Sequence, residues 1–350
     1  MSDHIKIAFI PPIGKSDYLA NTIIDGILWL KLEGKDIELA LPAYEYPCPY
    51  DILPYKISDD RFTGFADAAD LIILAGGKNA TNHALAEKIG RWDKTVFIDG
   101  SEPGKDRRYD PKVQADLRAM TYVGYGAIDS AMLSKCALYF RREKPYLSGI
   151  VPLPFGIESR YIEGFNPKAE KDIDFSCIFG QEDYPALRKQ ARKYLEKFCR
   201  KNGFTCETGK TRGFDFDDDR KLAGRQAYYD ILRRSKVGVS IGGGGFDTAR
   251  FWEILGNGCL LMTETIDIYG KAPESGDELD YSRIWQFRDI AEFEDRLGEV
   301  AAFLKNGYDS TETRDVAEVE YRRIIEAHSS KARVIAILEA AKKKDIIKIQ

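Results

Sequence analysis

The chain alternates short apolar runs, rich in β-branched residues, with longer segments in which apolar residues recur every three or four positions. This alternation predicts strand–helix–strand units, which build parallel sheets with helices on both faces. The predicted fold class is therefore α/β, with doubly wound, Rossmann-like parallel sheets. The strands are predicted at 6–12, 37–42, 71–77, 95–100, 137–142, 174–180, 204–208, 236–242 and 259–264.

Helical spacing between these strands is clearest over 183–203, where one face collects the apolar residues. Amphipathic segments at 17–33 and 79–91 are also predicted as helices. Two long polar helices, 287–306 and 313–344, are predicted to close the chain.

The length of 350 residues exceeds the size at which a single hydrophobic core keeps growing, so two domains are expected. A segment rich in Pro and Gly, 145–172, separates the two series of strands. We predict an N-terminal α/β domain over 1–150, a C-terminal α/β domain over 151–325, and a C-terminal helix within 326–350 that crosses back onto the N-terminal domain. Two such domains would face each other across a cleft lined by the carboxyl ends of their strands, where these folds bind ligands.

Composition excludes several other classes of protein. The net charge is −4 and no basic block dominates a segment, so we expect no nucleic-acid partner. No apolar run reaches the roughly 18 residues of a transmembrane helix. The six cysteines are scattered without a C-x-x-C pair, which predicts reduced thiols and a cytoplasmic protein. With only three histidines, a His-based zinc site is not expected.

The most informative segment is SKVGVSIGGGGFDTARFWEILGNGCLLMTE, residues 235–264. It predicts a buried strand, then four consecutive glycines, then a helix opened by Asp247, then a second strand. Glycines let a backbone approach a ligand closely, and the N–H groups of a helix start attract anions, so we predict a diphosphate site. Arg250 falls in the first helical turn and could bind phosphate oxygens, and Glu253 could accept hydrogen bonds from ribose hydroxyls. The competing interpretation is a plain glycine loop followed by a surface Arg–Glu ion pair.

This segment resembles the donor-binding region of GT-B glycosyltransferases, in particular the CgeB-like branch of the group 1 type. Arg250, Glu253 and Gly258 fit the family pattern of a small-residue strand, then Arg, then Phe-x-Glu or similar, then Gly before an apolar strand. Three further pieces agree in order: VPLPFGIESRYI resembles the interdomain entry, DIDFSCIFG the first strand of the donor domain, and YRRIIEAHSSKARVIAILEAA the terminal segment with His328 and Arg333. The resemblance covers roughly residues 150–340.

The resemblance implies a UDP- or GDP-sugar as co-substrate, with no further cofactor and no metal, because the helix dipole and Arg carry the leaving-group charge. The N-terminal half would then bind the acceptor, a glycan, a lipid-linked molecule or a small molecule. Gly180 stands where the family has a glycine near the diphosphate. The predicted nucleotide-binding residues are thus Gly180, Gly242, Gly243, Gly244, Gly245, Phe246, Asp247, Thr248, Arg250 and Glu253.

The sequence departs from the family pattern at one position that bears on the stereochemistry of the reaction. Many retaining members of the fold carry two glutamates separated by seven residues, and with Glu253 as the second, the first position is Gly245. This favours inversion, in which a carboxylate or His of the N-terminal domain deprotonates the acceptor hydroxyl. Asp99, at the end of an apolar strand and before a glycine, is the first candidate, with Glu102 three residues on. Asp17 is the second, and each could instead be an ordinary cap or turn residue.

Two histidines, an acidic run and an aromatic loop give weaker indications of function. His83 is expected to be a plain helix residue, and His328 to pack or to touch the donor rather than to move a proton. The acidic run 214–220 is predicted to be a solvated loop and not a metal motif, and the aromatic, proline-rich loop 41–55 could stack on a sugar.

The prediction is a glycosyltransferase that moves a sugar from a nucleoside diphosphate to a hydroxyl. The alternatives are a nucleotide-sugar epimerase of the same fold and a non-catalytic two-domain protein that binds a small ligand.

Overall fold

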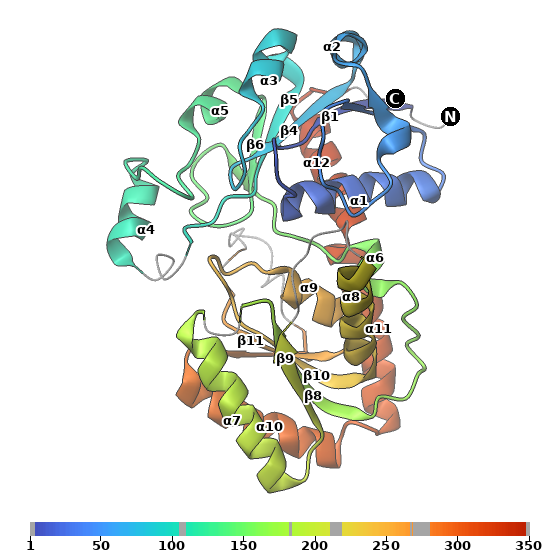
Figure 1. The fold of residues 1–350 in the computed structure, drawn as a ribbon, viewed down its shortest axis with the longest axis vertical. Coiled ribbons are helices and arrows are strands. Elements are labelled where there is room, and N and C mark those ends of the chain that lie inside the picture. The colour runs from blue at the N-terminus through green and yellow to red at the C-terminus, as the bar shows by residue number, and fades with distance from the viewer. Residues whose placement is uncertain are drawn as a thin grey trace. The chain divides into compact units, whose positions relative to one another are not determined.

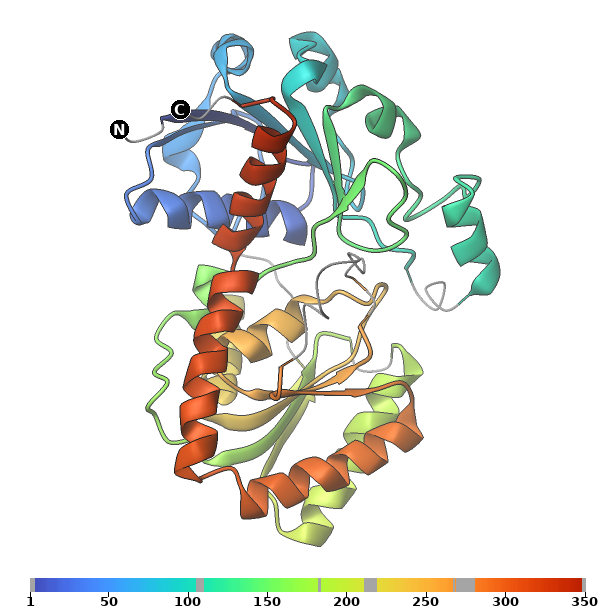
Figure 2. The same ribbon diagram turned by 180° about the vertical axis from the view of Figure 1, so that it is seen from behind.

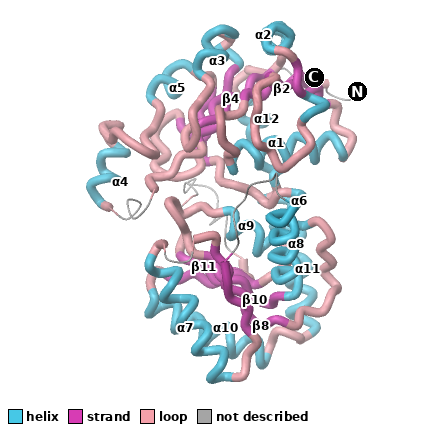
Figure 3. The backbone as a smooth tube through the Cα atoms, viewed as in Figure 1, coloured by secondary structure: helices cyan, strands magenta, loops and turns pink. Residues whose placement is uncertain are grey.

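The computed structural model of the protein describes residues 4–104, 110–181, 184–210, 219–266, 268 and 281–347. It divides into two compact units, each built around one parallel sheet (Figures 1 and 3). The first unit comprises Met1–Gly156, Ile268–Gly270 and Ser330–Gln350, and the second comprises Ile157–Asp267 and Lys271–Ser329. The prediction of an α/β protein with two doubly wound parallel sheets is confirmed. No helix in the described part of the chain is long and apolar enough to cross a membrane.

The first sheet has seven parallel strands in the order β3-β2-β1-β4-β5-β6-β7. The chain builds outward from β1 in one direction and then returns to build outward in the other, so the strand order reverses between β1 and β4. The strands are β1 (Ile5–Ile10), β2 (Ile37–Pro42), β3 (Lys56–Ile57), β4 (Leu71–Gly76), β5 (Thr95–Asp99), β6 (Leu138–Arg141) and β7 (Ile150–Pro152).

Both faces of this sheet are covered, which explains why its strands are almost continuously apolar. One face packs against α2 (Asp59–Ala68), α3 (His83–Ile89) and α5 (Ser130–Lys135), which contribute Phe62, Leu85 and Met132 to the core. Helix α1 (Tyr18–Leu32) lies beside the C-terminal helix α12 (Ser330–Lys343), as Figure 2 shows. Helix α4 (Pro111–Arg118) also belongs to this unit and is anchored by the buried Leu117.

The second sheet has five parallel strands in the order β12-β11-β10-β8-β9, with the reversal between β8 and β10. Phe175, Val239 and Met262 from its strands pack against Leu195 and Phe293 in the main hydrophobic core of this unit. The strands are β8 (Ile173–Phe179), β9 (Cys206–Lys210), β10 (Ser235–Ser240), β11 (Leu260–Glu264) and β12 (Ile284–Phe287). The helices are α6 (Ser159–Ile162), α7 (Ala186–Asn202), α8 (Asp219–Arg234), α9 (Ala249–Gly256), α10 (Ile290–Asn306) and α11 (Thr311–His328).

The structure corrects the predicted elements in two respects. Strands β3, β7 and β12 were not predicted, because they are two to four residues long and lie at sheet edges, and β7 falls within the segment predicted as a linker. The single helix predicted over 313–344 is two helices, because Ser329 takes extended backbone angles and pairs with Ile157. All six cysteines are free thiols.

The contact between α1 and α12 gives a stability prediction. A Cβ on Gly26 would lie 2.3 Å from the Ser330 carbonyl oxygen, which is backbone and has little room to move. We expect Gly26→Ala to lower the free energy of unfolding by about 1–3 kcal/mol, measured by urea denaturation. Gly64→Ala, also within a helix but with no atom within 4 Å of the added Cβ, is the control and should be neutral or stabilising. Equal stability of the two variants would contradict the predicted overlap.

Candidate functional site

The predicted glycine loop lies at the reversal point of the second sheet. Gly180 directly follows β8, and Gly242 to Gly245 follow β10, its neighbour in the sheet. Arg188 of α7 holds the two loops together: its Nε and Nη2 donate to the Ile241 carbonyl (3.2 and 2.9 Å), and its Nη1 donates to the Gln181 carbonyl (3.1 Å). The structure therefore brings together the glycines that the sequence places 62 residues apart, through an arginine that sequence reasoning did not single out.

The glycine loop makes its own hydrogen bonds. The Gly242 N–H donates to Oε2 of Glu264, the last residue of β11, at 2.9 Å, and the Gly243 N–H donates to the Gly245 carbonyl at 3.0 Å. A phosphate bound by these two N–H groups would have to replace both acceptors. Phe246 follows in the same loop and leads to the start of α9.

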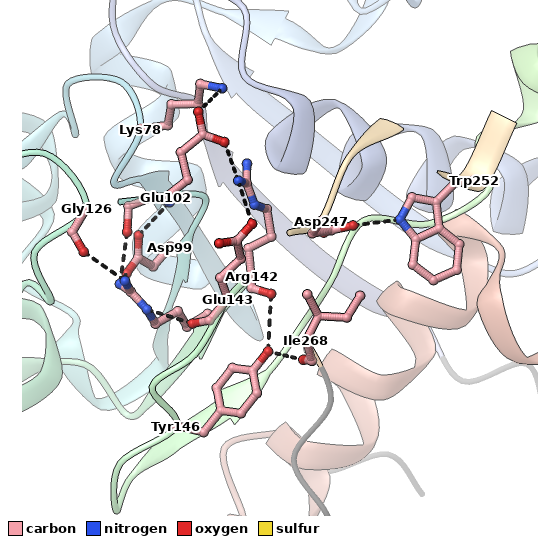
Figure 4. Close-up of polar contacts among 12 residues, drawn as sticks. Lys78, Asp99, Glu102, Gly126, Arg142, Glu143, Tyr146, Asp247, Trp252 and Ile268 are labelled. Carbon is pink, nitrogen blue, oxygen red and sulfur yellow. Dashed lines mark hydrogen bonds and ion pairs between the residues drawn. The ribbon is translucent and has the colours of Figure 1, made fainter. Parts of the chain in front are cut away.

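Helix α9 begins one residue later than predicted. Thr248, not Asp247, is the N-cap, and its hydroxyl accepts the Arg250 N–H. Asp247 instead accepts a hydrogen bond from the indole Nε1 of Trp252 (2.8 Å), which Figure 4 shows. The Trp252 ring packs against His328, whose Nε2 lies 3.0 Å from the Tyr281 hydroxyl. These contacts fix the helix start and bury His328 in the packing of this unit.

Arg250 and Glu253 form a buried ion pair rather than a surface one, with Nε and Oε2 separated by 3.6 Å. The Arg250 guanidinium lies 4.6 Å from the centre of the Tyr228 ring and donates to the Ile178 carbonyl of β8. The Glu253 carboxylate is 1% exposed and accepts hydrogen bonds from the hydroxyls of Tyr228 (3.0 Å) and Tyr229 (3.3 Å). Burial raises the pKa of both tyrosines well above its ordinary value, so they act as hydrogen-bond donors.

In the first unit, Asp17 is the N-cap of α1. Its Oδ1 accepts the N–H groups of Leu19 (3.0 Å) and Ala20 (3.1 Å), and its Oδ2 accepts from the Asn79 side chain (3.3 Å). Gly100 faces the same carboxylate, since a Cβ there would lie 3.0 Å from Oδ1. Burial raises the pKa of Asp17 above its usual value, against the lowering effect of the helix N–H groups and of nearby cations.

Asp99 has a different environment. Its Oδ1 accepts the Ser101 N–H (2.9 Å), and its Oδ2 accepts from the Tyr139 hydroxyl (2.7 Å) and from the Arg141 guanidinium. Arg141, fully buried, also donates to the Ser101 hydroxyl and to the Gly126 carbonyl. Asp99 is thus the centre of a buried network that joins β5, β6 and the loops after them.

A chain of alternating charges lies at the carboxyl ends of β4, β5 and β6 (Figure 4). Lys78 pairs with Oε1 of Glu102 at 2.9 Å, Arg142 pairs with Oε2, and Arg142 also contacts Glu143 (3.1 Å). Burial opposes ionisation of Glu102, but the charges of Arg142 and Lys78 outweigh it and lower the pKa of Glu102 to about 2. Burial raises the pKa of Tyr125 to about 12, and the Glu102 charge adds to this effect.

The other residues singled out from the sequence do not belong to the glycine loop, and some of them are outside the described residues. His83 is the first residue of α3, half exposed, with Nε2 3.8 Å from Asp129. Most of the acidic run 214–220 is outside the described residues, and its last two residues begin α8. In the loop 41–55, the Tyr46 hydroxyl contacts the backbone of Asp17 and donates to Asn21 (2.7 Å). Among the residues that the structure describes, no group of three or more His, Cys, Asp or Glu side chains could hold a metal ion.

Part of the chain is similar to a known protein family, and its fold is similar to that of solved enzymes. Residues 188–339 match the family model described as glycosyl transferase-like. An alpha-glucosyltransferase solved with UDP and a 13-mer DNA containing an A:G mismatch superposes with a TM-score of 0.55 at 10% identity, covering 97% of this chain and 99% of that one. A glycosyltransferase from Rickettsia africae ESF-5 gives a TM-score of 0.55 at 10% identity, covering 98% and 99%. No curated protein matches the sequence.

The fold is GT-B, and the family match lies mainly in the unit that holds the glycine loop. Residues 188–339 are thus similar to glycosyltransferases, and the chain as a whole has the fold of the solved enzymes. The CgeB-like branch stays a prediction.

The Glu102 network predicts a pH dependence of stability. Because the pKa of Glu102 is lowered from 4.5 to about 2, its contribution is fully present above about pH 4.5 and is lost as the pH falls towards 2. We expect Glu102→Gln to lower the free energy of unfolding at pH 7 by a few kcal/mol, with the difference from wild type shrinking below pH 4.5 in urea titrations. The control is Glu33→Gln, which removes an exposed ion pair with Lys331. A difference that is constant from pH 7 to pH 3 would contradict this electrostatic role.

Proposed function

We propose that the protein transfers a sugar from a UDP-sugar to an acceptor hydroxyl, with the donor bound by the second unit and the acceptor by the first. The observation that supports this most directly is the placement of the glycine loop, Arg188 and Arg250 at the reversal point of the second sheet, where doubly wound folds bind ligands. UDP is present in several structures of similar fold, including the alpha-glucosyltransferase complexes. These points favour UDP over GDP as the nucleotide.

In the donor site, Arg250 would stabilise the charge that develops on the departing diphosphate. Its guanidinium already donates to a backbone carbonyl at the end of β8 and packs on an aromatic ring, so its position is fixed before a ligand arrives. Glu253 would hold Arg250 and the two tyrosines in place. A ribose hydroxyl would reach this carboxylate only by replacing a tyrosine hydroxyl.

Asp17 is the better candidate for the base. Both oxygens of the Asp99 carboxylate are engaged in the buried network, Oδ1 by the Ser101 N–H and Oδ2 by the Tyr139 hydroxyl and the Arg141 guanidinium. Asp17 accepts hydrogen bonds from two backbone N–H groups and from Asn79. Burial raises its pKa towards the operating pH of a general base, against the lowering effect of the Lys78 and Arg142 charges. Asp17 would take the proton of the acceptor hydroxyl while that oxygen bonds to the anomeric carbon, and the bond from that carbon to the diphosphate breaks with its electron pair leaving on the phosphate. This step inverts the anomeric centre and uses arginine rather than a metal ion to balance the leaving charge.

The acceptor in this proposal is a glycan, a lipid-linked molecule or a small molecule with a free hydroxyl. Lys78, Glu102 and Tyr125 line the same sheet edge as Asp17 and offer both donors and acceptors to such a group. Because similar structures contain DNA, an acceptor screen should include DNA oligonucleotides beside glycosides.

Calorimetric titration of the purified protein with UDP, GDP, ADP and CDP, each with and without magnesium, tests the donor site. We expect UDP to bind without magnesium and Arg250→Lys to weaken it by about tenfold or more, because an ammonium cannot replace the fixed guanidinium fork but still neutralises Glu253. Arg296→Lys is the matched control, since Arg296 pairs with Glu299 at the same three-residue spacing on the exposed face of α10. Absence of UDP binding, or equal effects of the two substitutions, would contradict the proposal.

Asp17→Asn tests the base. Asparagine caps helices about as well as aspartate, so the free energy of unfolding should change by less than about 1 kcal/mol and the UDP affinity should stay as it is. The rate of UDP release with the best acceptor from the screen should fall by about 10²- to 10⁴-fold.

Asp110→Asn is the control, because Asp110 caps α4 in the same unit through its own Oδ1 and is exposed. If Asp17→Asn keeps transfer within a few fold of wild type, Asp17 is not the base.

A further inference from the structure

Glu264 ends β11 and faces the glycine loop. Its carboxylate is 4% exposed and accepts the Gly242 N–H at 2.9 Å. Its backbone is paired with Phe287 of β12, and the preceding residue, Thr263, is paired with Ser240 of β10, so the carboxylate is held by the sheet rather than by a loop. Nothing in the sequence pattern singled out this residue.

Charge is unevenly distributed along this edge of the sheet. Strand β10 lies between β11 and β8. Arg250 lies on the β8 side, where it contacts the Ile178 carbonyl, and Arg188 joins the loops after β8 and β10. The carboxylate of Glu264 lies on the β11 side.

This distribution decides which part of a nucleotide sugar can occupy each side. Two like charges a few ångströms apart in a partly buried site repel each other strongly, so a diphosphate is disfavoured beside Glu264 and favoured beside the arginines. A neutral sugar has the opposite preference, because its hydroxyls donate hydrogen bonds and a carboxylate is an acceptor with two oxygens.

We infer that Glu264 binds hydroxyls of the donor sugar and determines which sugar is transferred. This inference rests on the proposed function. The diphosphate would occupy the arginine side of the loop, and vicinal hydroxyls of the sugar would bind the carboxylate on the β11 side.

The test compares the affinity for UDP with the affinity for UDP-sugars. Wild type, Glu264→Gln and Glu264→Asp are titrated calorimetrically with UDP, UDP-glucose, UDP-galactose and UDP-N-acetylglucosamine. In wild type at least one UDP-sugar should bind more tightly than UDP. Glu264→Gln should reduce that preference by about tenfold, while UDP itself binds equally or more tightly because a nearby negative charge is gone. Glu264→Asp, which keeps the charge but is one methylene shorter, should reduce the preference without improving UDP binding.

The control is Glu320→Gln, since Glu320 likewise accepts a backbone N–H, from Ser282 at 2.9 Å, but outside the glycine loop. If both Glu264 variants keep the wild-type preference for a UDP-sugar over UDP, the inference is overturned. The proposed function still stands in that case, provided that UDP binds. Loss of UDP and UDP-sugar affinity together, with a lower melting temperature, would assign Glu264 a structural role and also overturn it. If wild type binds neither UDP nor any UDP-sugar, the proposed function and the inference both fail.

Discussion

All strands within each sheet run parallel, and the placement of every candidate residue depends on this constraint. Parallel strands bring their carboxyl ends to one edge, and the loops that follow them meet there. The order of strands reverses between β1 and β4 in one unit and between β8 and β10 in the other. At these two points neighbouring loops leave the sheet in opposite directions, which gives room for Asp17 and Asn79 in the first unit and for the glycine loop in the second.

The inner strands of both sheets were predictable because a strand covered on both faces must be apolar along its whole length. Leu71–Gly76 and Val237 to Val239 are examples, and no other element explains such short buried runs. Elements fixed by distant contacts were not predictable. The helical period continues through Ser329, and only its pairing with Ile157, 172 positions earlier, ends α11 there. The two-residue strand β3 likewise depends on its neighbour β2 rather than on its own pattern.

The candidate site was predictable as a set of residue types but not as a set of partners. The order of glycines, Arg250 and Glu253 predicts an anion site, yet it does not reveal that Tyr228 and Tyr229 bind the Glu253 carboxylate. The pair formed by Asp99 and Arg141 is another case, since a charge in a strand pattern shows neither its burial nor its partner. Buried charges need compensation from groups that the fold brings close, and a single sequence holds no local signal of that pairing.

The two units are both doubly wound but differ in the charge at the helix that follows the reversal point, and in the proposed function this difference separates the two ligands. A helix start offers N–H groups to an anion. At α1 those groups are already bound by the Asp17 carboxylate, so a phosphate would meet both a blocked donor set and a like charge. At α9 the cap is the neutral Thr248, and two arginines lie at the adjoining strand ends. The proposed function follows this difference: it places the acceptor hydroxyl beside the acid of the first unit and the diphosphate beside the arginines of the second.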